Sequence, residues 1–244
     1  MNSHLSSAMI YNRYMRIGSR IVRPDEVGLW PAEILQISVY RGMKDSLVFM
    51  RQCAVRCREA RLPYVIHPIN FSLFDEEAFR DLREMAEWSD LGMILHDERT
   101  AEGRVKGGAE RLFREALAEL ASKNAVSFEN ATDTGDVLWF WAEYADSITI
   151  DLGHVEAWGL DSVAFVQGLD EAAVRKVEYV HMHRNNGWRS GLTDHWPLTR
   201  DCREVMALRE LLRRKRNVGV LLEINETDRI PESLEILREL RDGC

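Results

Sequence analysis

The feature that most constrains the fold of this chain is a regular alternation of short apolar segments with amphipathic helical patterns. Near-continuous apolar content predicts strands that are buried on both faces. These strands are expected at Ile34–Val39, Tyr64–His67, Gly92–His96, Val126–Glu129, Ser147–Asp151, Val177–His181 and Gly219–Glu223. Helices are expected at Lys44–Ala60, Asp75–Trp88, Ala109–Ser122, Thr132–Tyr144, Ala172–Lys176, Arg200–Arg216 and Glu232–Leu240. Strands that alternate with helices predict a parallel sheet.

Length and one missing motif distinguish between the two common parallel architectures. The chain has 244 residues, which is close to the ~250 residues of one (β/α)8 barrel. An open doubly wound sheet is the alternative, but no G-x-G-x-x-G follows any predicted strand. We therefore predict an α/β fold with a single (β/α)8 TIM barrel, in which helices surround parallel strands and residues 1–244 form one domain. The first strand is expected in the irregular region 1–33, at Met9–Tyr11 or at Arg20–Val22.

Charge and composition exclude some classes of protein. The formal net charge of -8 argues against tight, unspecific binding to nucleic acid, so DNA is a disfavoured partner. The basic run at 213–216 is explained by the end of a helix, where cations are favoured. No apolar stretch approaches the ~20 residues of a membrane helix, and the four cysteines form no C-x-x-C pair. We expect a cytoplasmic protein without a signal peptide, and the oligomeric state stays open.

Ionisable side chains end six successive predicted strands. They are His67, His96, Glu129, Asp151, His181 and Glu223, and His154, Asp194 and His195 lie in the loops that follow strands. Because the carboxyl ends of all strands meet at one mouth of a closed barrel, these side chains should point at a shared volume. Imidazole and carboxylate groups together are the ligands that divalent transition metals prefer. The pattern therefore predicts a metal site at the mouth.

Each of these residues taken alone has an ordinary structural explanation. A single histidine at a strand end is more often hydrogen-bonded than bound to a metal. Glu129 or Asp151 can cap the helix that follows, and Glu223 can pair with an arginine. His183 is interpreted as a plain polar loop residue. Six independent coincidences are much less probable than one shared site, which is why the metal site is preferred.

The segments that carry these residues resemble the xylose isomerase-like barrel superfamily, and more narrowly its endonuclease IV branch, the AP endonuclease family 2 group. The similarity runs from about Ile34 to the C-terminus. It is carried by VIHPIN at 65–70, MILHDE at 93–98, SFENAT at 127–132, IDLGHVEAW at 150–158, VHMHRNNG at 180–187, TDHWPL at 193–198 and LLEIN at 221–225.

The resemblance implies a cluster of two or three divalent metal ions, with zinc, manganese or iron as candidates. The implied ligands are His67, His96, Glu129, Asp151, His154, His181, His195 and Glu223. The family's usual Asp-x-His motif has Thr193 at its acidic position here, so Asp194 is a further candidate ligand. In the isomerase and epimerase branch, the counterparts of Glu129, Asp151, His181 and Glu223 hold a single ion.

The leading functional hypothesis is a metal-dependent hydrolase that acts on a phosphoester. The expected substrate is a phosphodiester of a small molecule, nucleotide-like or cobamide-like, and the nucleophile is a metal-activated hydroxide. Glu129, Glu223 and His181 are the candidate catalytic residues. Substrate binding is assigned to Arg184 and Arg189, which can pair with a phosphate, and to Trp188, which can stack on an apolar group.

Two alternatives stay open. The first is a metal-dependent isomerase or epimerase of a sugar or sugar phosphate, with Glu129 and Glu223 as acid and base. His67 and His96 are unnecessary for that chemistry, which places it second. The second alternative is a barrel that binds a ligand and catalyses no reaction. It is motivated by Thr193, since loss of a ligand can leave a binding protein.

Overall fold

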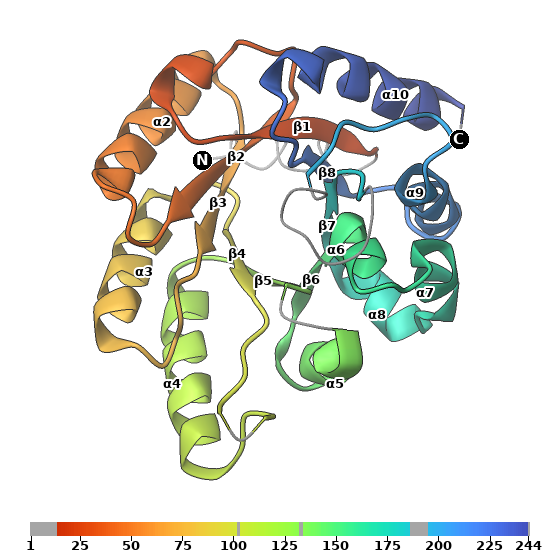
Figure 1. The fold of residues 1–244 in the computed structure, drawn as a ribbon. Coiled ribbons are helices and arrows are strands. Elements are labelled where there is room, and N and C mark those ends of the chain that lie inside the picture. The colour runs from red at the N-terminus through yellow and green to blue at the C-terminus, as the bar shows by residue number, and fades with distance from the viewer. Residues whose placement is uncertain (1–13, 102, 132–133, 186–194, 244) are drawn as a thin grey trace, which may run out of the picture.

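The computed structural model describes residues 14–101, 103–131, 134–185 and 195–243. The described strands form one closed parallel barrel in chain order, and its last strand pairs with its first (Figure 1). The strands are β1 (Arg16–Ile21), β2 (Ile34–Tyr40), β3 (Tyr64–Ile69), β4 (Met93–His96), β5 (Val126–Glu129), β6 (Ser147–Asp151), β7 (Val177–Met182) and β8 (Gly219–Leu222). The prediction of an α/β fold with a single (β/α)8 barrel is confirmed.

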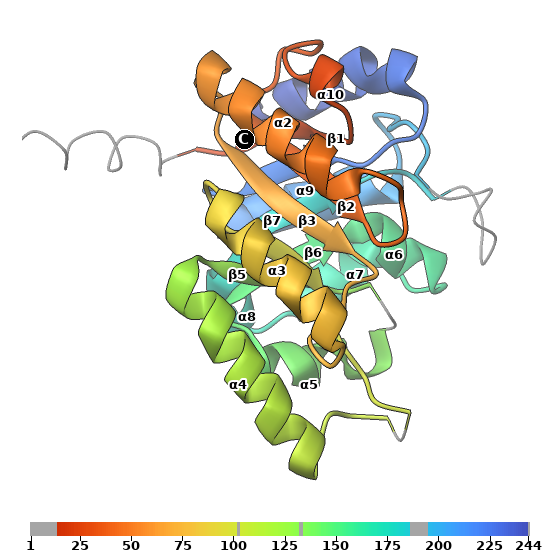
Figure 2. The same cartoon turned by 90° about the vertical axis from the view of Figure 1, so that its left-hand side faces the viewer.

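Helices cover the outside of the barrel. They are α2 (Ser46–Ala60), α3 (Glu76–Trp88), α4 (Gly107–Lys123), α5 (Thr134–Tyr144), α6 (Leu152–Ala157), α7 (Ser162–Gly168), α8 (Glu171–Lys176), α9 (Arg203–Arg214) and α10 (Ile230–Asp242). Short 3-10 turns lie at Pro24–Glu26 and Thr227–Arg229. Figure 2 shows α2, α3 and α4 side by side along one flank, where neighbouring helices also contact each other. No helix among the described residues is long and apolar enough to cross a membrane.

The first strand differs from both sequence-based candidates. β1 spans Arg16–Ile21 and shares only its last two residues with the candidate Arg20–Val22, while Met9–Tyr11 lies outside the described residues. Gly18, Ser19 and Arg20 interrupt its apolar pattern, which is why periodicity does not reveal it. A side chain at Gly18 would overlap the backbone carbonyl of Ile34 on β2. Close pairing with β2 and β8 therefore specifies this strand more than local propensity does.

The connection from β6 to β7 holds three short helices, of which the sequence analysis predicted only α8. α6 and α7 were missed because each has fewer than eight residues and little periodic pattern. Their starts are nevertheless marked, since an aspartate precedes each of the three helices and accepts a hydrogen bond from a backbone N–H in the first turn. These N-caps are Asp151, Asp161 and Asp170.

The barrel interior places an apolar layer directly beneath the polar mouth. One small core cluster inside the barrel contains Ile34, Val65, Ile94, Tyr179 and Leu221. Because side chains on a strand alternate between its two faces, the residue two positions later points to the same interior. The second residues after Val65, Ile94, Tyr179 and Leu221 are His67, His96, His181 and Glu223. The apolar layer thus lies directly below the ionisable side chains inside the barrel.

Candidate metal centre

The mouth of the barrel brings side chains from six strand ends into contact. Neighbouring strands pair His96 on β4 with Glu129 on β5, and Asp151 on β6 with His181 on β7. His67 lies on β3, and Glu223 follows β8. All of these residues except His96 are almost completely buried, and 23% of the His96 side chain is exposed. Parallel strands in register therefore supply the convergence that the sequence pattern predicted.

Glu129 is the centre of this arrangement, because its carboxylate faces imidazole rings from four different elements. Its Oε2 atom lies 3.2 Å from His67 Nε2 and 3.7 Å from His96 Nε2. Its Oε1 atom lies 3.2 Å from His181 Nδ1 and 3.4 Å from His154 Nδ1. Neither oxygen has a hydrogen-bond partner within the described part of the chain. A buried carboxylate surrounded in this way requires a cation or a proton to offset its charge.

The hydrogen bonding of His67 supports a metal ion as that cation. Its Nδ1 atom lies 2.9 Å from the backbone carbonyl of Ile94, which can only accept, so Nδ1 carries the proton. A neutral His67 ring therefore turns the lone pair of Nε2 toward Glu129. Two lone pairs at 3.2 Å repel each other unless a positive group, a metal ion or a proton, lies between them. Both ring nitrogens of His181 are also buried without a partner in the described region, so the donor set fits a divalent ion.

Two other carboxylates, those of Asp151 and Glu223, complete the centre. Asp151 accepts a hydrogen bond of 2.7 Å from the N–H of His154, and Asn130 holds its backbone through two further hydrogen bonds of 2.7 and 2.9 Å. Glu223 accepts a short hydrogen bond from Gln36 Nε2 on β2. Sequence reasoning missed Asn130 and Gln36 as supporting residues. The available signal was a buried polar residue inside or directly after an apolar strand.

The charges of these groups shift their pKa values strongly. Burial raises the pKa of Glu129, but the nearby rings of His181 and His67 lower it by more. The pKa of Glu129 is therefore well below the usual value. Burial also raises the pKa of Glu223, and His181 with Arg20 turns the net shift downward. Ionised carboxylates are therefore the stable form, which is the form that binds a metal.

The pKa values of the histidines shift in opposite directions, because nearby carboxylates outweigh desolvation at His154 and His181 but not at His96. Burial lowers the pKa values of His154 and His181, but Asp151 and Glu129, respectively, reverse this and raise each to about 9. Desolvation dominates at His96 and lowers its pKa to about 4, with Glu129 opposing it only in part. His96 is thus neutral at physiological pH. His154 and His181 must release protons before they bind a metal at that pH.

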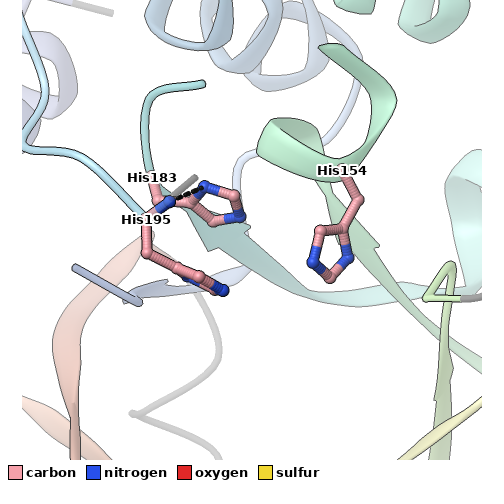
Figure 3. A group of neighbouring side chains, drawn as sticks. All are labelled: His154, His183 and His195. Carbon is pink, nitrogen blue, oxygen red and sulfur yellow. Dashed lines mark hydrogen bonds between the residues drawn. The ribbon is translucent and has the colours of Figure 1, made fainter. Parts of the chain in front are cut away.

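Within each of four groups of three residues, the ligand atoms lie within 4.8 Å of one another, and the three groups that contain a carboxylate share residues. The four groups are His67–His96–Glu129, Glu129–Asp151–His181, His67–His181–Glu223 and His154–His183–His195. Glu129 belongs to two of these groups, and only the last group contains no carboxylate (Figure 3). The described residues thus offer a carboxylate-rich part and an imidazole part of one mouth.

The interpretation of His183 as a plain polar loop residue is wrong. Its ring is completely buried and contacts Asp151 and the segment that carries His195. Sequence reasoning missed it because one histidine after a strand has no periodic signal, although it shares an alternating strand face with His181.

The residues predicted to bind substrate are only partly described. Arg184 is half-buried, and its guanidinium lies 5.7 Å above the ring of Trp196, with which it also exchanges two backbone hydrogen bonds. Arg184 lies beside the mouth, and its role in substrate binding stays a prediction. Arg189, Trp188 and Asp194 lie outside the described residues, so their predicted roles are not tested.

Comparison with known proteins identifies the fold and no sequence family. No family model matches the chain, and no curated protein matches it. Among solved structures, a D-tagatose 3-epimerase-like protein has 15% identity and a TM-score of 0.68, covering 94% of this chain and 98% of that one. The IOLI protein with a binding zinc atom has 10% identity and a TM-score of 0.63, covering 93% and 96%.

A third similar structure is D-psicose 3-epimerase with D-tagatose from Clostridium cellulolyticum, with 9% identity and a TM-score of 0.52, covering 94% and 92%. At these identities the likeness concerns the fold alone. It does not single out the endonuclease IV branch that the sequence motifs suggested. In its fold the chain is therefore similar to these barrels, as the sequence resemblance implied.

Proposed function

We propose that this protein is a metal-dependent isomerase or epimerase of a small sugar or sugar-like hydroxycarbonyl compound. This reverses the order of the two enzymatic hypotheses from the sequence, where phosphoester hydrolysis came first. Two similar solved structures are named as 3-epimerases or epimerase-like proteins, and another carries zinc, which supports the proposal. Zinc, manganese and iron are the candidate ions, because imidazole and carboxylate ligands suit all three.

The observation that carries the proposal is a pair of buried carboxylates placed around one histidine. Glu129 on β5 and Glu223 after β8 come from different sides of the barrel wall, and His181 shares a ligand group with each of them. Both carboxylates are buried and have lowered pKa values. Two such groups facing one volume are what proton transfer to and from the two sides of a bound substrate requires.

Each step can be assigned to residues of this chain. A bound divalent ion would supply a Lewis acid that polarises the substrate carbonyl. One carboxylate, Glu129 or Glu223, takes the proton from the carbon next to the carbonyl, and the electron pair moves onto the carbonyl oxygen. The other carboxylate, which is also ionised in the metal-free chain, first takes up a proton from water and then gives it to carbon. The atoms of substrate and product balance, and only the position or configuration changes.

Phosphoester hydrolysis remains the second candidate because of one specific observation. His67, His96 and Glu129 form a further ligand group beside the one that proton transfer would use. A second ion there would suit a hydrolase, since clustered metals activate water and stabilise a leaving oxygen. His96 belongs to this group alone, so it separates the two functions.

The deciding experiment combines metal analysis with two activity assays on the full chain. Solvent deuterium incorporation into a panel of ketoses and ketose phosphates, followed by NMR, reports proton transfer directly. Hydrolysis of bis(p-nitrophenyl) phosphate reports phosphodiester chemistry. We expect deuterium incorporation that disappears in Glu129→Gln and in Glu223→Gln and persists in His96→Asn.

Other outcomes identify the alternatives. Phosphodiester hydrolysis that is lost in His96→Asn would replace the proposal with the hydrolase. Metal binding without turnover in either assay would favour a non-catalytic ligand-binding barrel. A chain that binds no zinc, manganese or iron would refute both enzymatic functions.

A further inference from the structure

The backbone partner of each histidine at the mouth reveals which ring nitrogen carries its proton. His195 Nδ1 lies 2.6 Å from the backbone carbonyl of Glu223, which can only accept, so Nδ1 is the donor. A neutral His195 therefore has its lone pair on Nε2, as His67 does. His183 is the opposite case, because its Nδ1 atom lies 3.2 Å from the backbone N–H of His195, which can only donate. A neutral His183 ring consequently carries its proton on Nε2.

The proton on His183 Nε2 faces a carboxylate. This nitrogen lies 3.1 Å from Asp151 Oδ1 and 3.2 Å from Asp151 Oδ2, and both residues are completely buried. Asp151 accepts this proton from one side while it also caps α6 through the N–H of His154. One ring thus connects the carboxylate at the end of β6 with the backbone of His195, twelve residues further along the chain than His183.

The contact with His183 stabilises an unusual backbone conformation of His195. His195 has a φ of 57°, a left-handed conformation that is unfavourable for a residue with a side chain. Three hydrogen bonds hold it there, from its N–H to His183, from its ring to Glu223, and from the N–H of Asn225 to its carbonyl. Figure 3 shows the first of these and the three rings around one volume.

The fold reserves the space for the His183 ring. A Cβ atom at Gly153, in the first turn of α6, would overlap the Cε1, Nδ1 and Nε2 atoms of that ring. Gly153 has ordinary helical surroundings in α6, where alanine has the higher helix propensity. Glycine at position 153 is therefore explained by the space that the His183 ring needs and not by the conformation of α6.

We propose that His183 is a positioning residue that ties Asp151 to the backbone of His195, and that it thereby orients His195 beside His154, the two histidines that the family resemblance implies as ligands in this part of the mouth. His183 serves as a clamp with one donor and one acceptor, not as a third ligand. The proposal rests on the metal-binding part of the proposed function and is independent of the reaction catalysed.

Zinc titration of three His183 variants tests the clamp, with a chromophoric chelator as competitor. His183→Leu removes both hydrogen bonds, and we expect the affinity of the weakest zinc equivalent to fall about 10–100-fold, as for other groups that orient metal ligands. His183→Asn keeps an acceptor near the position of Nδ1, and His183→Gln keeps a donor near that of Nε2. Each should recover part of the loss. Equal loss in all three variants would show instead that His183 is a ligand, and unchanged affinity in His183→Leu would refute both roles.

Gly153→Ala offers a matched test that keeps every atom of the His183 ring. The added methyl group displaces the ring, so the zinc affinity should fall as in His183→Leu. Gly168→Ala is the control, because a Cβ atom there has no neighbour within 4 Å. Circular dichroism and thermal unfolding of each variant verify folding. An unchanged zinc affinity in Gly153→Ala would contradict the positioning role.

A direct measurement needs no metal and no variant. Nitrogen-15 NMR of the metal-free protein labelled at histidine, at a pH where the rings are neutral, reports which nitrogen is protonated. We expect the Nε2–H form for His183 and the Nδ1–H form for His195. An Nδ1–H form at His183 would overturn the inference even if zinc binds normally. A chain that fails to bind zinc yet shows these two forms would refute the proposed function and leave the clamp intact.

Discussion

The two parts of the barrel mouth are both candidates to bind a metal ion, but they differ in the charge of their side chains. The carboxylate-rich part contains Glu129, Asp151 and Glu223, all buried. The imidazole part contains His154, His183 and His195, and His154 loses its charge when it releases its proton. Burial of several carboxylates is costly without a cation, whereas imidazoles that have released their protons require no compensation. The first part therefore demands an ion for stability, and the second part only offers a place for one.

The largest effect that distinguishes the two parts is expected from Glu129→Gln. The substitution removes the charge shared by two ligand groups, so the carboxylate-rich part should lose its ion. Turnover should fall about 10²–10⁴-fold, the range supplied by a positioned acid or base. Elemental analysis and deuterium exchange measure both losses. His154→Gln, the matched change in the imidazole part, should leave the ion beside Glu223 in place.

Removal of the metal should destabilise the folded protein, because the ion binds only the native arrangement of ligands. At a free-ion concentration about 1,000 times Kd, the stabilisation is about 4 kcal/mol. Urea unfolding with and without a chelator measures it. An identical free energy of unfolding in both conditions would show that the buried carboxylates need no cation, which removes the basis of the contrast between the two parts.

Metal choice should also separate the two parts. Oxygen-rich sites accept manganese, whereas all-nitrogen sites favour the later ions, zinc among them. We expect manganese to saturate only the carboxylate-rich part and zinc to fill both, so that zinc reaches a higher number of equivalents per chain. Isothermal titration with each ion reports the numbers. Equal stoichiometry for manganese and zinc would mean that the two parts form one undivided site.

The pH dependence of stability should differ between the metal-free and metal-loaded protein. The pKa values of His154 and His181 rise from 6.5 to about 9 in the folded, metal-free chain. Their contribution to stability is complete below pH 6.5 and is lost as the pH rises through about 9. Metal replaces those protons, so the loaded protein should not show this decline and its metal affinity should increase over the same range. Urea unfolding at several pH values, with and without metal, tests the difference.

The smallest expected effect concerns the support of Glu223. Gln36→Leu removes the hydrogen bond that the amide donates to this carboxylate, at nearly unchanged volume. Leaving a buried acceptor without its donor costs about 1–3 kcal/mol. Unfolding measurements should show this loss in the metal-free protein and less of it in the loaded protein. A loss of the same size in both would assign Gln36 a role in the fold alone.

Much of the architecture could be read from the sequence because strands in a closed parallel barrel are buried on both faces. That burial leaves apolar runs such as Val65–Ile66 before His67, and the runs mark seven of the strands. β1 was not predicted, because Gly18 and Arg20 suit close strand pairing and contacts across the barrel and do not form an apolar run. The short helices α6 and α7 were not predicted, because aspartate caps specify them and hydrophobic periodicity does not.

The site was predictable to the extent that chemistry follows position along a strand. The ends of seven strands are visible in the sequence, and closure of the barrel forces these ends together, so residues such as Glu129 and His181 could be nominated. Distances and partners are not visible in this way. The role of His183 depends on a backbone N–H twelve residues away and on the space left by Gly153. The support of Glu223 by Gln36 joins residues that are 187 positions apart.

The sequence by itself determined the barrel and the chemical character of its mouth, because alternating apolar strands and the polar residues that end them are local patterns. Only the tertiary structure decided which groups share a volume, which nitrogen of each histidine carries the proton, and where charge accumulates. These properties arise from contacts between distant segments at distances of a few ångströms. They control pKa values and metal preference, and no local pattern in the chain specifies them.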